Sequence, residues 1–429
     1  MCGIVGVVAE RNAVPILMEG LRRLEYRGYD SAGIAVLGAD RRLARVRAVG
    51  KVKVLEDALE AAPIAGHVGI AHTRWATHGV PTQRNAHPHV SRDGVAIVHN
   101  GIIENHEALR SGLTNLGYTF DSETDTEVIA HRIHHHLASS SSLYEAVRKT
   151  VAELEGAYAL AVVAESDPET IVLAREGCPV VVGLGIDENF VASDVAALLP
   201  VTRRFMFLEE GDVAEVRRTA ITVIDSHGAR VSRAVRESEL PADAVERGPY
   251  RHFMLKEIHE QPRAIAQTLE ERVSGPKLLD AAFGPGAHEA FKKVKAAHIA
   301  ACGTSFHAGL VAGYFIEQYC RIPARVEIAS EYRYRDPVIT PDTLFITISQ
   351  SGETADTLAA LRNARRAGYL STLSICNVAE SSMVRESDLV LLTRAGPEIG
   401  VASTKAFTTQ LTALAMLIVA LAKRRPDGS

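Results

Sequence analysis

The sequence predicts two domains of different fold class: an α+β layered domain over residues 2–225 and an α/β doubly wound domain over residues 291–429. In the first half, strand-like apolar segments come in runs and the helical segments are grouped, which is typical of a layered α+β fold. In the last third, short apolar strands alternate with helices, as in a parallel doubly wound sheet. Residues 226–290 carry charges, Pro241 and Gly248, which favour a linker followed by connecting helices.

The first domain begins with an apolar strand followed by an amphipathic helix. Residues 3–9 are mostly apolar, and residues 13–24 place apolar side chains at helical spacing. Further apolar runs predict strands at 33–37, 43–49, 68–72, 95–99, 157–164, 170–174, 180–184, 212–217 and 221–225. Helical periodicity predicts helices at 104–116, 126–137 and 143–154.

Helical periodicity returns after the linker at residues 252–269. There Lys256 and Glu260 stand four residues apart, as on a solvated helix face. The second domain then shows short apolar strands at 294–301, 325–328, 344–349, 372–376 and 389–392. Its predicted helices lie at 306–319, 355–367 and 404–422.

The composition excludes several classes of function. The chain has 429 residues, 47% of them hydrophobic, and a formal net charge of −5, so no basic face for nucleic acid is implied. Its five cysteines are dispersed, which argues against a disulfide framework or a zinc site and fits a reducing compartment. No basic segment opens the chain, and the longest apolar run, 411–422, is shorter than the roughly 18 residues of a membrane span. We therefore expect a cytoplasmic protein without a nucleic-acid partner, membrane partner, metal or cofactor.

Cys2 is the first residue that carries chemistry. Its small side chain beside Met1 is the setting in which an initiator methionine is removed, and removal would leave a thiol and a free α-amine on one residue. An α-amine has a pKa of about 7.7–8.0, so it can act as a base near neutral pH and activate the thiol. While Met1 stays, the amine lies in a peptide bond and cannot do so. The alternative is a small core residue at the start of a strand, which is the commoner situation for a cysteine considered alone.

Four segments together resemble one enzyme family. They are residues 2–4 (CGI), 72–79 (HTRWATHG), 99–101 (HNG) and 122–125 (SETD). As a set they resemble the class II glutamine amidotransferases. With the second half of the chain they most resemble the aminotransferases that transfer ammonia from glutamine to fructose 6-phosphate and form glucosamine 6-phosphate. The resemblance implies an N-terminal-nucleophile αββα sandwich followed by a sugar isomerase domain.

The resemblance implies three catalytic residues. Cys2 would attack the carboxamide carbon of glutamine and form a thioester. The side-chain amide of Asn100 and the N–H of Gly101 would hold the oxyanion, and losing one such donor typically costs about 10²–10³ in rate. Taken alone, Asn100-Gly101 reads more simply as a hairpin turn.

The resemblance also implies five residues that line the glutamine pocket. Arg74 would bind the α-carboxylate of glutamine, for which a bidentate guanidinium is suited, and Asp125 would bind the α-ammonium. Thr77 and His78 would line the same pocket, and Trp75 would be the gate to an ammonia passage. Taken alone, Asp125 is an ordinary residue of a first helical turn, and Arg74 with Trp75 is a surface cation–π pair.

A histidine cluster offers a competing hypothesis of a metal site. His131, His134 and His135 fall near one face of a predicted helix. No acidic or thiol ligand recurs at matching spacing, so we do not predict a metal there.

Two loops of the second domain combine hydroxyl groups with the start of a helix. Residues 301–305 (ACGTS) and 349–354 (SQSGET) each follow a strand and precede a helix, where N–H groups and the helix dipole favour a phosphate. One such loop is usually an ordinary capped helix start, but two at the ends of parallel strands indicate a ligand crevice. The resemblance to a sugar isomerase domain implies sugar-phosphate binding by Cys302, Thr304, Ser305, Ser349, Gln350, Ser351 and Thr354, and by Val401 and Ser403 of a further loop. Cys302 reads equally well as a small buried residue.

The sequence departs from the family in one respect. The family normally has two sugar isomerase domains, and the second, with the residues for proton transfer and Schiff-base chemistry, is absent here. We therefore expect a fragment of a longer aminotransferase, and the paired sugar domains of the family imply a homodimer. The alternatives are a shortened protein with glutaminase activity and sugar-phosphate binding only, a phosphoribosyl amidotransferase, and a non-enzymatic sugar-phosphate sensor. The missing phosphoribosyl-diphosphate loop disfavours the second, and the intact nucleophile and oxyanion motifs disfavour the third.

Overall fold

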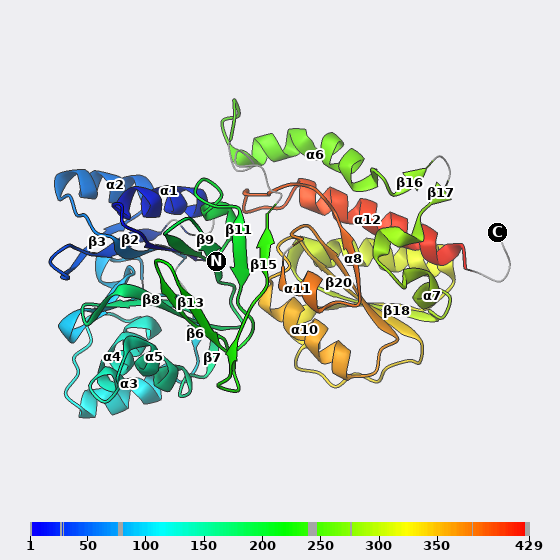
Figure 1. Ribbon diagram of the computed structural model, residues 1–429. Helices are drawn as coiled ribbons and strands as arrows, with labels where there is room; N and C mark the ends of the chain where they lie inside the picture. Colours follow the sequence, from blue (N-terminus) through cyan, green and yellow to red (C-terminus); the bar gives the residue numbers. More distant parts are fainter. Residues whose placement is uncertain are drawn as a thin grey trace. The chain divides into compact units, whose positions relative to one another are not determined.

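A computed structural model describes residues 2–25, 28, 30–75, 80–238, 247–274, 277–379 and 381–424. The chain folds into two compact units, Met1–Val245 and Glu246–Ser429 (Figure 1). The first unit is built on antiparallel sheets and the second on a parallel sheet.

Two antiparallel sheets form the first unit. The first has the order β15 (Val235–Glu237), β11 (Arg204–Phe207), β9 (Val181–Leu184), β10 (Asn189–Ala192), β1 (Gly3–Val8), β4 (Val68–Arg74), β2 (Ser31–Leu37) and β3 (Leu43–Val49). The second has the order β14 (Arg230–Val231), β13 (Ile221–Ile224), β12 (Val213–Arg217), β8 (Asp167–Glu176), β7 (Gly156–Ala164), β6 (Val95–Ile103) and β5 (His89–Ser91).

Helices cover the outer faces of both sheets. On the first sheet lie α1 (Val14–Leu24) and α2 (Val52–Ala61), and on the second lie α4 (Asp125–Leu137) and α5 (Leu143–Val151), with α3 (His106–Asn115) against α4 (Figure 1). Side chains of β1 alternate between the layers: Val5 and Val7 pack with the α1 core, whereas Ile4 and Val8 pack between the sheets. These four layers confirm the predicted αββα sandwich.

Several elements of the first unit escaped the sequence analysis. Helix α2 buries only Val52 and Leu55, so its apolar face is too narrow to stand out. Strands β14 and β15 lie within 226–290, where a linker and helices were predicted, so the beginning of that segment belongs to the sheets. All three residues of β15 are exposed, and backbone pairing with β11 holds the strand without an apolar pattern.

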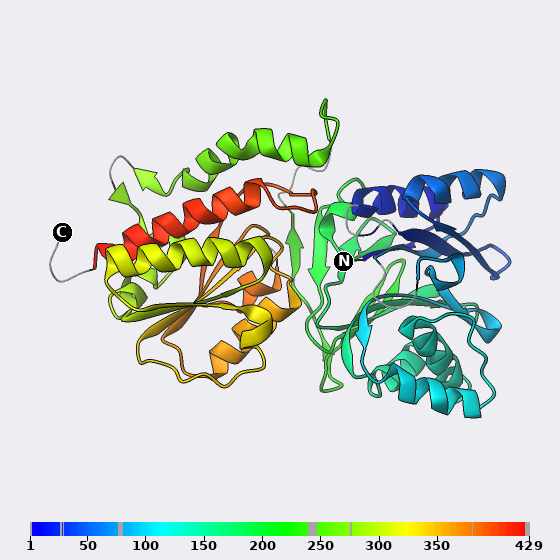
Figure 2. The same cartoon turned by 180° about the vertical axis from the view of Figure 1, so that it is seen from behind.

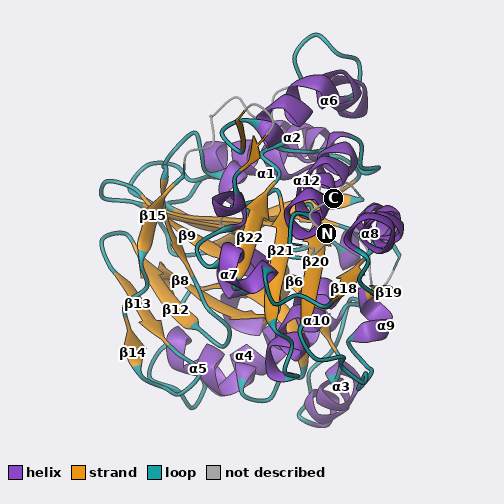
Figure 3. Cartoon of the chain, turned by 90° about the vertical axis from the view of Figure 1, so that its right-hand side faces the viewer, coloured by secondary structure: helices purple, strands orange, loops and turns teal. Residues whose placement is uncertain are grey.

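The second unit contains a five-stranded parallel sheet. Its order is β19 (Ala324–Ile328), β18 (Ala296–Ala301), β20 (Thr343–Ser349), β21 (Ser371–Cys376) and β22 (Leu389–Leu392) (Figure 3). The helices are α6 (Phe253–Leu269), α7 (Ala287–Phe291), α8 (Gly303–Phe315), α9 (Ala329–Tyr332), α10 (Ala355–Arg366), α11 (Ser382–Glu386) and α12 (Lys405–Ala422). A short hairpin is made by β16 (Val273–Ser274) and β17 (Lys277–Leu278). After β18 the chain adds β19 on one side and then crosses to add β20 on the other side, so the direction of strand addition reverses, as in a doubly wound sheet. This arrangement confirms the predicted class.

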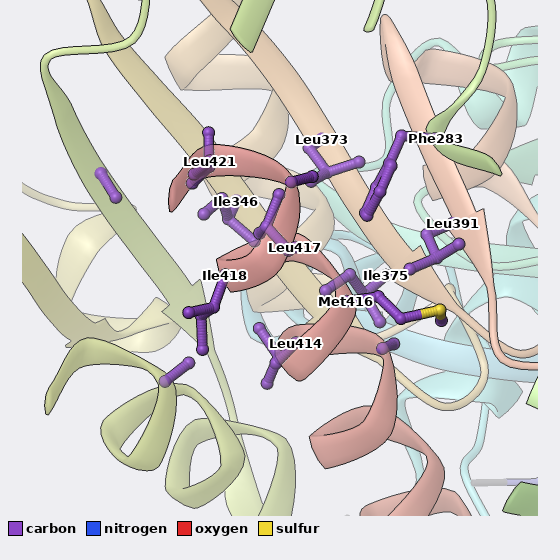
Figure 4. Packing of buried hydrophobic residues seen from close by; sticks show 14 of the residues in the cluster. Phe283, Ile346, Leu373, Ile375, Leu391, Leu414, Met416, Leu417, Ile418 and Leu421 are labelled. Carbon is purple, nitrogen blue, oxygen red and sulfur yellow. The ribbon is translucent and has the colours of Figure 1, made fainter. Parts of the chain in front are cut away.

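Helix α12 is the core helix of the second unit. Leu414, Leu417 and Leu421 share one buried cluster with sheet residues such as Ile346 and Leu373 (Figure 4). The helix also packs against α8, and Figure 2 shows these two helices side by side. Its 18 residues are long and apolar enough to cross a membrane, but 61% of them are buried inside the unit, as expected of a core helix.

Candidate active site

Four segments of the first unit meet at one pocket. Cys2 directly precedes β1, Arg74 ends the neighbouring β4, Gly101 lies on β6 of the other sheet, and Asp125 begins α4. The pocket is lined by Cys2, Arg74, Trp75, His87, His99, Gly101, Thr124, Asp125 and Thr126. Five residues predicted from the sequence are therefore brought together, although their numbers span more than a hundred positions.

The Cys2 thiol is held by the backbone of Trp75. The Trp75 N–H donates to Cys2 Sγ at 3.2 Å, and the thiol lies 3.5 Å from the Trp75 carbonyl oxygen. Burial raises the pKa of the Cys2 thiol, and the hydrogen bond to Trp75 only partly opposes this effect. A thiol with a raised pKa needs a base before it can attack a carbon atom.

Asn100 and Gly101 lie inside β6, where they pair with Ala159 and Tyr158 of β7. The alternative of a hairpin turn at these residues is therefore wrong. The Asn100 side chain donates from Nδ2 to the Cys2 carbonyl oxygen at 3.1 Å. Gly101 has a φ of 132°, a conformation that favours glycine.

Opposite charges face the same pocket from Arg74 and Asp125. Both are buried, with 3% and 4% of their surfaces exposed, so Arg74 is not the surface residue of a cation–π pair. Asp125 Oδ2 accepts a hydrogen bond from the Ile103 N–H at 2.9 Å. A guanidinium and a carboxylate in one pocket match the two charged groups of a free amino acid.

Two other predicted pocket residues, Thr77 and His78, lie outside the described residues. Two histidines of the cluster considered on α4 have hydrogen-bonding partners in the protein. His131 Nδ1 lies 2.8 Å from Ser91 Oγ, and His134 Nδ1 lies 2.7 Å from the Tyr118 hydroxyl. These rings serve packing and hydrogen bonding within the unit.

A buried histidine network supports the pocket and was missed by the sequence analysis. Thr126 Oγ1 lies 2.8 Å from His87 Nε2 and 2.9 Å from His99 Nδ1. The rings of His72 and His87 lie with centroids 4.2 Å apart. The only signal in the sequence is the density of histidines in 72–99, which does not say which of them are buried.

The buried histidines should make the first unit sensitive to acid. Burial lowers the pKa of both His72 and His89 to about 3, against an ordinary value of 6.5. As the pH falls below about 6.5, the unfolded chain binds protons that the folded unit does not bind until about pH 3, so the free energy of unfolding falls. We expect the two histidines together to cause a loss of about 4 kcal/mol between pH 7.5 and pH 5.

Urea unfolding followed by fluorescence measures this loss, because the single tryptophan, Trp75, lies in the first unit. The midpoint should be lower at pH 5 with an unchanged slope. His89→Gln, which can keep the contact of 3.1 Å with Thr124 Oγ1, should reduce the difference. Equal midpoints at the two pH values would contradict the prediction.

In the second unit, the two predicted phosphate loops follow adjacent strands. Residues 302–305 come after β18 and residues 350–354 come after β20, and Ala301 is paired with Ile348. The order of strand addition reverses between these two parallel strands, and ligands bind at such a point in open α/β sheets. The loops also lead into α8 and α10, so both helix N-termini lie at this edge.

The hydroxyl groups of these loops are ordered by hydrogen bonds. Ser349 Oγ accepts from the Gly352 N–H at 3.0 Å and lies 3.1 Å from Thr354 Oγ1. Ser305 Oγ accepts at 3.0 Å from the side chain of Gln410, a buried residue of α12 that the sequence analysis did not single out. Because Ser305 accepts this bond, its own proton is left to donate to a ligand.

The remaining predicted residues of the second unit lie around the same edge. Thr304 is in the first turn of α8, and Gln350 and Ser351 directly follow β20. Cys302 is half-buried, with its Sγ 3.8 Å from Thr357 Oγ1. In the third loop, Val401 is 76% exposed, whereas Ser403 Oγ donates to Glu398 at 2.9 Å.

Two family models match the chain and agree with this division. A glutamine amidotransferase domain matches residues 72–200, and an SIS domain matches residues 290–420. Fold and matches together define the class: an amidotransferase domain followed by a sugar isomerase domain.

Similar proteins narrow this class further. Glutamine--fructose-6-phosphate aminotransferase [isomerizing] of Pseudomonas aeruginosa is 60% identical over 100% of this chain and 70% of its own length. The protein of that name from Idiomarina loihiensis is 59% identical over 99% of this chain and 70% of its own. The chain belongs to the glutamine–fructose-6-phosphate aminotransferase (isomerizing) family.

Solved structures with matching segments were also found. The C-terminal domain of glucosamine-fructose-6-phosphate aminotransferase from Francisella tularensis is 51% identical and covers 42% of this chain and 50% of its own, with a TM-score of 0.41. Glutamine phosphoribosylpyrophosphate amidotransferase from B. subtilis is 19% identical and covers 96% of this chain and 92% of its own, with a TM-score of 0.48.

Proposed function

We propose that this chain hydrolyses glutamine at Cys2 and delivers the ammonia to fructose 6-phosphate, forming glutamate and glucosamine 6-phosphate. The observation that carries the proposal is the single pocket in which the Cys2 thiol, the Gly101 backbone and the buried charges of Arg74 and Asp125 meet. A thiol nucleophile, an oxyanion donor and two opposite charges are the groups that hydrolysis of an amino-acid amide requires.

In the proposed reaction, Cys2 Sγ attacks the side-chain carbonyl carbon of glutamine. The negative charge that develops on the carbonyl oxygen is held by the Asn100 side-chain amide and the Gly101 N–H. Collapse expels ammonia and leaves a thioester, which water hydrolyses to glutamate and the free thiol. Because burial raises the pKa of the thiol, the proton has to pass to a base, and the α-amine of Cys2 supplies one once Met1 is removed.

Glutamine is oriented by its two charged ends. Arg74 binds the α-carboxylate and Asp125 binds the α-ammonium, so that the side-chain amide is directed toward Cys2. Thr77 and His78, which lie outside the described residues, are proposed to bind glutamine as well. Trp75, whose backbone already holds the thiol and whose surface is 39% exposed, is the proposed gate for ammonia.

The sugar phosphate is held by the second unit, at the edge where β18 and β20 end. The proposed ligands are those implied by the resemblance: Cys302, Thr304, Ser305, Ser349, Gln350, Ser351, Thr354, Val401 and Ser403. The two helix N-termini support the proposal because they present N–H groups to a phosphate. Domain bounds of 2–225 and 291–429, a homodimer and a cytoplasmic location stay predictions.

The N-terminal amine provides the direct test of the proposed hydrolysis. Protein whose mass shows that Met1 has been removed should release glutamate from glutamine. A matched chain that keeps one residue before Cys2 should release at least about 10²-fold less, because its amine is blocked while its fold is the same. Glucosamine 6-phosphate is measured in parallel. Failure of the processed protein to release glutamate would exclude the proposed function.

Loss of the Ser305 hydroxyl should weaken sugar-phosphate binding. A hydrogen bond to a charged group contributes about 1.5–3 kcal/mol, so Ser305→Ala should raise the Kd for fructose 6-phosphate by roughly 10- to 100-fold. Titration calorimetry measures the Kd. The control is Thr412→Ala, which removes a hydroxyl that donates to the Thr408 carbonyl oxygen within α12. An unchanged Kd for Ser305→Ala would remove this residue from the site.

A further inference from the structure

We propose that His72 is a positioning residue for the oxyanion site: its ring N–H fixes the side-chain amide of Asn100 so that Nδ2, and not Oδ1, faces the reacting carbonyl. The inference rests on the proposed hydrolysis at Cys2 and deepens it. It adds a residue that is neither the nucleophile nor itself part of the pocket lining.

His72 connects the two sheets beside Asn100. It lies on β4, and its side chain is buried with 0% of its surface exposed. Its Nε2 atom lies 3.1 Å from the His99 carbonyl oxygen and 3.0 Å from Asn100 Oδ1, both on β6 of the other sheet. The same ring nitrogen therefore contacts the backbone carbonyl of His99 and the side chain of Asn100.

The partners of His72 settle its protonation. A backbone carbonyl oxygen only accepts hydrogen bonds, so Nε2 has to carry the proton. Burial lowers the pKa of His72 to about 3, so the ring is neutral near pH 7 and Nδ1 is bare. Nδ1 has no hydrogen-bond partner among the residues that the structure describes. Burying a nitrogen without a partner costs free energy, and an apolar residue of similar size would avoid this cost.

The fixed N–H gives the Asn100 amide one favourable orientation. As placed, Oδ1 accepts from His72 and Nδ2 donates to the Cys2 carbonyl oxygen at 3.1 Å. Turning the amide over would set the NH₂ group against the His72 N–H and Oδ1 against the Cys2 oxygen, so both hydrogen bonds would become repulsive contacts. Nδ2 carries two protons, and the second is left for the oxyanion.

Without His72, the Cys2 carbonyl is the one partner left among the described residues that distinguishes the two orientations of the amide. An inverted Asn100 presents a lone pair to the oxyanion and removes one of its two donors. The expected cost is that of losing an oxyanion donor, about 10²-fold in kcat. The KM for glutamine should stay within about threefold, because the charged ends of the substrate are bound elsewhere.

Three substitutions separate positioning from simple packing. His72→Leu removes the donor. His72→Gln places an amide N–H near the position of Nε2, whereas His72→Asn places it near Nδ1, so only the glutamine variant should recover kcat, to within about tenfold of the original chain. The two amide variants match in polarity and serve as controls for each other even if the leucine variant folds poorly. Equal kcat values for His72→Gln and His72→Asn would overturn the inference.

A double-mutant cycle adds a readout that a structural role would not give. If His72 acts through Asn100, His72→Leu should have little further effect on kcat in an Asn100→Ala background. If the two substitutions lowered kcat independently, so that their fold-losses multiplied, the inference would be overturned. Failure of the processed, unsubstituted protein to release glutamate would overturn the proposed function as well, whereas an active protein with indifferent His72 variants overturns only this inference.

Discussion

Replacing Cys2 with alanine is expected to lower kcat for glutamine hydrolysis by on the order of 10⁴-fold or more. Among the described residues that line the pocket, the Cys2 thiol is the one group that can form the thioester. The substitution leaves the α-amine and strand β1 in place. Because the loss is chemical, the Kd of the protein for fructose 6-phosphate should not change. Release of glutamate and titration calorimetry measure the two effects on the same preparation.

Cys178→Ala is the matched control for this substitution. Cys178 is also a half-buried cysteine of the first unit that forms no disulfide, but it does not line the pocket. It should keep kcat within about threefold of the unsubstituted chain. If Cys2→Ala retains the original rate, or if both variants lose activity equally, the assignment of the nucleophile is wrong.

Gly101→Ala is expected to destabilise the first unit by about 3 kcal/mol or more and to remove its glutaminase activity. The φ of Gly101 is 132°, and a Cβ atom there would lie 1.9 Å from the Ala157 carbonyl oxygen of β7. Because a backbone oxygen in the middle of a sheet cannot move aside cheaply, the strands would have to separate. The N–H proposed to hold the oxyanion would move with them.

Urea unfolding gives the stability change, and Gly117→Ala provides the comparison. Gly117 also has a positive φ, of 81°, but a Cβ atom there would meet nothing within 4 Å. Its substitution should therefore cost only the backbone strain, about 1 kcal/mol, with normal activity. Equal losses of unfolding free energy in the two variants would contradict the prediction, because they would show that the clash with β7 is relieved.

Long apolar and strongly periodic elements could be predicted from the sequence because burial imposes a pattern on them. Strand β1 and helix α12 are examples, and the two fold classes followed from the order of such elements. Strand β15 and helix α2 could not be predicted in this way, because both are largely exposed and are held by pairing or by a narrow face. Their structure depends on partners that lie far away in the sequence.

In the pocket, too, local motifs predict some residues, whereas other contacts depend on residues that are distant in the sequence. Cys2, Arg74, Gly101 and Asp125 were selected by motif, and the structure brings them together. His72 stands in one of those motifs, yet its bond to Asn100 depends on the stacking of two sheets, which no local pattern shows. Gln410 is hidden for the same reason, since it meets Ser305 only after α12 has packed beside α8.

The position of β1 has a consequence for the entropy of the reaction. The beginning of a chain is ordinarily its most mobile part. Here Cys2 immediately precedes a strand that is hydrogen-bonded to β10 on one edge and to β4 on the other. The conformational freedom that a loose terminus would lose on approaching the carbonyl carbon has already been lost during folding. Folding, and not the binding of glutamine, therefore supplies that part of the ordering which the transition state needs.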